Sequence, residues 1–75
     1  MSSVDDELAR VAAEVHALAE QLADLALDRL RAALDPEDPE SAEAAALERR
    51  ITRARRALEK AAGLLEGPPA VLDDP

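Results

Sequence analysis

The residues of this chain whose type and spacing could support binding chemistry are the arginines of residues 49–56, where five of the eight positions are Arg. On a helix, four basic residues share one side at intervals of three and four, namely Arg49, Arg53, Arg56 and Lys60. This basic stripe has the chemistry to bind phosphate groups or an acidic protein. A solvated helix face has the same pattern, with arginine stems covering apolar surface. Both interpretations remain open.

The charge of the whole chain disfavours nucleic acid as the partner of this stripe. The net charge is −8, and Phe, Trp and Tyr are absent, so the chain repels phosphates and cannot stack on bases. Residues 1–35 carry a net charge of −5 and residues 47–66 a net charge of +3. We therefore expect the acids of the first segment to neighbour these arginines, within one chain or between two copies. Those acids are Glu14, Glu20, Asp24 and Asp28.

The remaining polar residues indicate neither catalysis nor a metal centre. His16 is the only histidine, and Ala occupies position 13, where a di-iron bundle would place the Glu of its Glu-x-x-His motif. We expect His16 to pack at the edge of an apolar face, with a pH-sensitive interface as the alternative. The acids Glu37, Glu40 and Glu43 could hold a hard cation, but acids at a helix start also complement its dipole. The pattern predicts a non-enzymatic protein without cofactors.

Size and composition predict an all-α fold with one domain. The 75 residues include 18 Ala and 12 Leu, both strong helix formers, and no Cys. A chain of this length buries little surface alone and lacks disulfides to compensate. We expect residues 1–67 to form a helical hairpin and residues 68–75 a flexible, Pro-containing tail.

The first helix is predicted over residues 4–34, with Ser3 as its cap. Apolar residues follow heptad spacing along its first part and drift beyond it, so an eleven-residue repeat fits the whole helix better. Together they cover about half of the helix circumference, which indicates contact with more than one neighbouring helix. The predicted seam residues of this helix are Leu8, Val11, Val15, Leu18, Leu22, Leu25, Leu30 and Leu34.

The second helix is predicted over residues 39–65. The sequence "DPEDPES" breaks the first helix, since a residue before proline avoids the helical conformation. Asp38 suits the N-cap and Pro39 the first helical position. Gly67, followed by two prolines, ends the helix. Its seam residues are Leu47, Ile51, Ala54, Leu58, Ala61 and Leu65.

Two long antiparallel helices leave more apolar surface than one hairpin contact can cover. Burying one Leu or Val side chain contributes about 1.5–3 kcal/mol. Two hairpins packed face to face cover these side chains in a two-fold symmetric four-helix bundle. The sequence therefore predicts a homodimer, with a higher homo-oligomer or a heteromeric complex as the alternatives.

The segment "LDRLRAALDPEDPESAEAAALERRITRARRALEK", about half of the chain, resembles the paired helices in C-terminal docking regions of modular polyketide synthases. Those regions form dimeric four-helix bundles that align successive enzymes, so the resemblance implies a bundle of that kind and a docking role.

These features predict a small protein that acts by binding other proteins, as an adaptor, a regulator or an accessory subunit. A docking or stabilising subunit of a larger enzyme complex is one alternative, and an anion- or nucleic-acid-binding regulator that uses the basic stripe is another. The acidic N-terminus and the lack of long apolar runs indicate a cytoplasmic protein with no membrane contact. Eight Arg, one Lys and abundant Ala are typical of a GC-rich bacterial genome.

Overall fold

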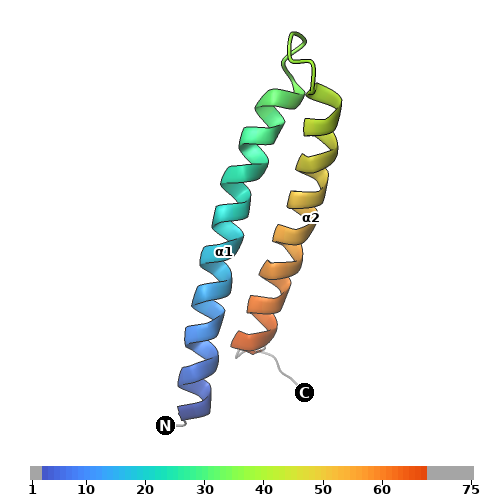
Figure 1. Ribbon diagram of the computed structural model, residues 1–75. Helices are drawn as coiled ribbons and strands as arrows, with labels where there is room; N and C mark the ends of the chain where they lie inside the picture. Colours follow the sequence, from blue (N-terminus) through green and yellow to red (C-terminus); the bar gives the residue numbers. More distant parts are fainter. Residues whose placement is uncertain (1–2, 68–75) are drawn as a thin grey trace.

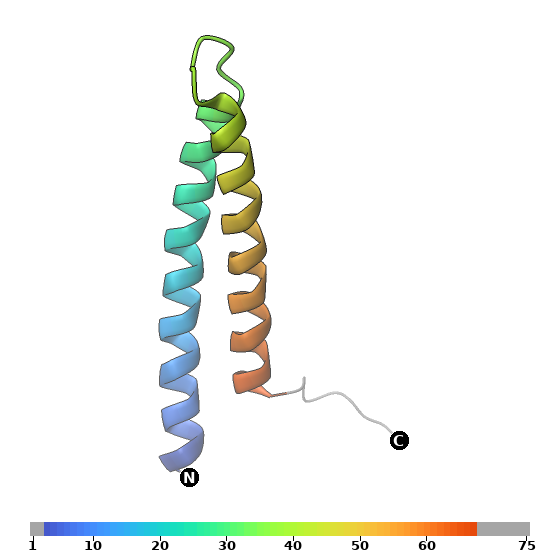
Figure 2. The same cartoon turned by 45° about the vertical axis from the view of Figure 1, so that its right-hand side comes forward.

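The computed structural model describes residues 3–67, which form two helices packed side by side in antiparallel directions (Figure 1). Helix α1 covers Ser3–Ala33 and helix α2 covers Ser41–Glu66. Figure 2 shows that the pair is one layer thick, with the turn at one end. The described residues contain no strand, and the predicted all-α hairpin is confirmed.

The linker between the helices consists of two consecutive turns with the same local sequence, Asp-Pro-Glu. The Asp35 carboxylate accepts a hydrogen bond from the Glu37 backbone N–H at 2.9 Å, and the Asp38 carboxylate accepts one from Glu40 at 2.8 Å. An aspartate that binds the backbone two residues ahead stabilises a turn. Helix α2 therefore begins at Ser41, two residues after the predicted start, and Pro39 lies in the second turn.

The contact between the two helices is built from alanines. The buried side chains of residues 3–67 are Ala12, Ala19 and Ala26 of α1 and Ala44 and Ala62 of α2. Those of α1 recur every seven residues, so the heptad describes this contact. Because alanine is small, the helices approach closely there. Larger apolar side chains then lie beside the contact line and remain partly exposed.

Helix α2 ends where the sequence predicts. Gly67 has a φ of 87°, a conformation that glycine adopts without steric cost, and its N–H donates a hydrogen bond to the Gly63 carbonyl at 3.2 Å. The tail of residues 68–75, predicted to be flexible, lies outside the described residues.

The two described glycines give opposite predictions for substitution by alanine. A Cβ added at either Gly63 or Gly67 meets nothing within 4 Å, so only backbone conformation distinguishes them. We expect Gly63→Ala, inside the helix, to raise the free energy of unfolding by about 0.5–1 kcal/mol. Gly67→Ala is expected to lower it by about 1–3 kcal/mol, because its φ is positive. Urea unfolding measures both, and equal shifts would contradict this assignment.

Candidate interaction surface

A row of large apolar side chains runs along one side of α1. Val11, Leu18 and Leu25 each precede one of the buried alanines, at Ala12, Ala19 and Ala26, and so lie about 100° away from the contact line. Their exposed fractions are 44%, 50% and 53%. The hairpin therefore leaves half of each of these side chains in water.

Helix α2 contributes smaller side chains to the same side of the hairpin. Leu47, Ala54 and Ala61 each directly precede a more buried residue of α2. In two antiparallel helices, the residues that precede the contact positions lie on the same side of the pair. We call the surface formed by Val11, Leu18, Leu25, Leu47, Ala54 and Ala61 the apolar face.

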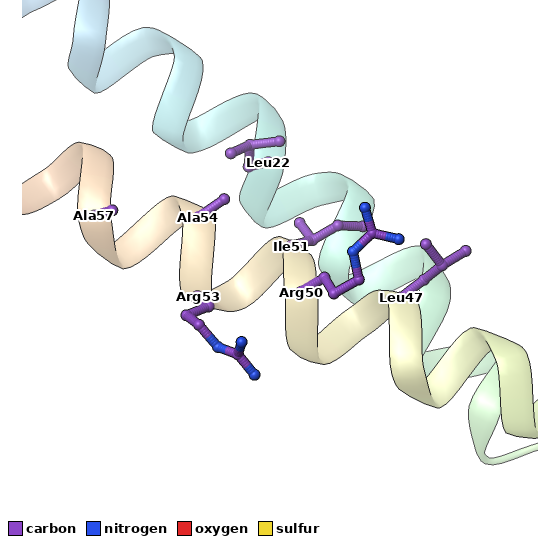
Figure 3. Close-up of a pocket in the computed structure, with 7 residues that line it drawn as sticks. All are labelled: Leu22, Leu47, Arg50, Ile51, Arg53, Ala54 and Ala57. Atoms are coloured by element: carbon purple, nitrogen blue, oxygen red, sulfur yellow. The ribbon is translucent and has the colours of Figure 1, made fainter.

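A shallow groove lies between the helices on the side of α2 that carries Leu47 and Ala54. Figure 3 shows Leu22 of α1 beside Ile51 and Ala54 of α2, with the Arg53 guanidinium directed away from the groove. Arg50 is among the lining residues and adds a positive charge at the border. The complete lining is Leu22, Leu47, Arg50, Ile51, Arg53, Ala54 and Ala57. The floor of the groove is thus apolar, and its border on α2 carries arginine side chains.

The predicted seam residues fall into three groups in the hairpin. One group is half-buried beside the alanine contact: Val15, Leu22, Ile51, Leu58, Ala61 and Leu65. A second group is exposed on or next to the apolar face: Leu8, Val11, Leu18, Leu25, Leu47 and Ala54. The third, Leu30 and Leu34, is exposed near the turn. In the sequence, the seven-residue spacing of the alanines of α1 indicated the contact line that the structure shows. Nothing in the sequence distinguished Ala62 of α2 as a buried residue.

Leu27 lies on the opposite side of α1 from the apolar face. It follows the buried Ala26, whereas Leu25 precedes it, so the two leucines flank the contact line. The exposed fraction of Leu27 is 46%, close to that of Leu18. The turn end of the hairpin therefore carries a second apolar surface, formed by Leu27, Leu30 and Leu34.

Polar contacts between the two helices are few. The Nε2 of His16 and Oε2 of Glu66 lie 3.0 Å apart, which joins α1 to the last turn of α2. His16 is thus at the edge of the helix contact. The other ion pairs in residues 3–67 stay within one helix. Arg55 contacts Glu59, and Arg29 contacts Asp28, whose hydrogen bond and charge raise the pKa of Arg29 above its usual value.

The basic stripe is solvent-exposed along α2 at all four of its positions, Arg49, Arg53, Arg56 and Lys60. Three of its arginines line a shallow hollow with Glu48 and Thr52, where the Thr52 hydroxyl donates a hydrogen bond to Glu48 at 2.8 Å. Within residues 6–67, no ion pair joins an acid of α1 to an arginine of α2. One hairpin therefore does not bring the opposite charges of its two helices together.

Acidic and histidine side chains do not converge in the part of the chain that the structure describes. No group of three or more such residues there could hold a metal ion, and the glutamates of residues 37–43 are no exception. Neither α1 nor α2 has the length and apolar character needed to cross a membrane.

The apolar face is therefore the surface of the hairpin best suited to contact with another protein. Comparison of the chain with protein-family models, curated proteins and solved structures finds no match.

Proposed function

We propose that this protein is a homodimeric interaction protein that works by association rather than catalysis, and that the apolar face is where two copies meet. The observation that supports this most directly is the row of Val11, Leu18 and Leu25, each about half exposed. An apolar row along several turns of one helix, continued by a neighbouring helix, is typical of a protein interface.

The energy available from this surface is large relative to the stability of a small domain. Each fully buried Leu or Val contributes about 1.5–3 kcal/mol. Among residues 3–67 the hairpin buries only alanines, and the larger apolar side chains stay partly exposed, so covering them contributes further free energy. A second hairpin placed on the apolar face covers both rows at once and forms a four-helix bundle.

The remaining surfaces suit contact with a different protein. The basic stripe and Leu27 both lie outside the apolar face and stay accessible in such a dimer. A larger enzyme or regulatory complex would contact the dimer there. The protein would thus serve as an adaptor or accessory subunit, with a docking subunit of an enzyme complex as the related alternative.

Sedimentation of the purified chain tests the proposal. We expect one helical species of about 16 kDa, twice the 8.0 kDa of a single chain, at micromolar concentrations. A folded species of 8.0 kDa that melts cooperatively, with no dependence on concentration, would overturn it. An aggregated or molten chain would instead support the docking subunit that needs its enzyme partner.

A further inference from the structure

We infer that the two copies pack about a two-fold axis parallel to their helices, so that α1 of each copy lies on α2 of the other. This inference rests on the proposed homodimer and specifies its arrangement. The competing arrangement has its axis perpendicular to the helices and places α1 on α1 and α2 on α2.

The sizes of the side chains on the apolar face favour contact between unlike helices. Helix α1 presents the large residues Val11, Leu18 and Leu25, whereas α2 presents one large residue near the turn, Leu47, followed by the small residues Ala54 and Ala61. Facing layers pack densely when large side chains on one lie opposite small ones on the other. Contact between like helices would place leucine against leucine and alanine against alanine, which crowds one half of the interface and leaves the other half loose.

The register of the hairpin places these residues at matching levels. Leu22 shares the groove with Ile51 and Ala54, so Leu18, one turn earlier in α1, lies level with the stretch between Ala54 and Ala61. Rotation about an axis parallel to the helices keeps every residue at its level. Leu18 of one copy therefore meets the gap between the two alanines of the other copy.

Charge favours the same arrangement. Residues 1–35 are net acidic and residues 47–66 net basic, and no ion pair within residues 6–67 joins an α1 acid to an α2 arginine. Contact between unlike helices places the exposed Asp28 on the border of α1 near the level of Arg50 of the other copy. Contact between like helices would instead bring like charges together, which is unfavourable.

Enlarging an alanine of α2 distinguishes the two arrangements by the sign of its effect. We expect Ala54→Leu to raise the dimer Kd at least about tenfold, because it fills the space that Leu18 of the other copy occupies. The double variant Leu18→Ala/Ala54→Leu restores the volume and should recover most of the affinity. Ala46→Leu is the matched control, since Ala46 is exposed outside the apolar face. Tighter dimerisation of Ala54→Leu would overturn the arrangement, because contact between like helices leaves room at this position.

Spin labels at the turn test the axis directly. The chain has no Cys, so Glu37→Cys gives a single labelled site per copy. The proposed axis brings both turns to the same end, with labels less than about 30 Å apart, whereas the perpendicular axis separates them by about 40 Å or more, the length of α2. Glu20→Cys, near the middle of α1, is the control, because its labels should be close in either arrangement.

The outcomes separate this inference from the proposed function. A dimeric mass with distant turn labels overturns the arrangement and leaves the homodimer intact. A folded monomer without dipolar coupling in either labelled variant overturns both.

Discussion

Leu18→Asp is expected to convert the dimer to a monomer at micromolar concentrations. Leu18 is 50% exposed in the hairpin, so the substitution leaves the alanine contact within each copy unchanged. The dimer loses the burial of the exposed half of two leucines, about 1.5–3 kcal/mol in total, and must also bury two carboxylates. A loss of this size raises Kd by more than about a hundredfold. Sedimentation equilibrium measures the change in mass and in Kd.

Leu27→Asp is the matched control for that experiment. It makes the same substitution on the same helix at a residue of similar exposure, 46%, but on the other side of the contact line. The control should dimerise like the unmodified chain, within about 0.5 kcal/mol. Equal losses from both substitutions would show that the apolar face has no special role in association.

Leu22→Asp and Ile51→Asp are each expected to dissociate and unfold the protein in a single step. Both side chains are half-buried and lie together in the groove between the helices, where Arg50 lies at the border and the Arg53 guanidinium points away. In the proposed dimer the second copy covers the groove, and a carboxylate buried there without a close partner costs about 3–5 kcal/mol. Each dimer carries two such carboxylates, a cost of about 6–10 kcal/mol, which is comparable to the stability of about 5–15 kcal/mol of a small domain, so we expect a large loss of folded dimer. Circular dichroism at 222 nm measures the loss of helix.

Ala17→Asp controls for the change in helix propensity. Ala17 is exposed on α1, so its replacement introduces the same carboxylate into solvent. We expect a cost of about 0.7 kcal/mol or less and a retained helical signal. If Leu22→Asp and Ile51→Asp melted at the same temperature as Ala17→Asp, the groove would not be part of the folded core.

The resemblance to synthase docking regions predicts contact with another enzyme in addition to self-association. The proposed arrangement places the turns of both copies at the same end of the bundle. Leu27 and Leu34 lie near the turn of each copy, and Leu34 is 73% exposed. Two such surfaces at one end would allow a dimer to contact a partner that is itself two-fold symmetric.

The two helices follow from the sequence alone, and their limits to within two residues, because helix formation and termination depend mainly on local interactions. Alanine and leucine predicted the helices, and Gly67 predicted the end of α2. The start of α2 was predicted two residues early at Pro39. The Asp35 and Asp38 carboxylates each stabilise a turn, and the competition between a turn and a helix cap cannot be decided from residue preferences.

Only the tertiary structure decided which apolar residues face the other helix. The row that contains Leu18 and the row that contains Ala19 both recur at helical intervals, about 100° apart, so periodicity allowed either. Close approach of two helices selects the smaller side chains, and alanine therefore forms the contact within the hairpin. The same packing leaves the leucine row exposed on the apolar face, where a second copy can cover it.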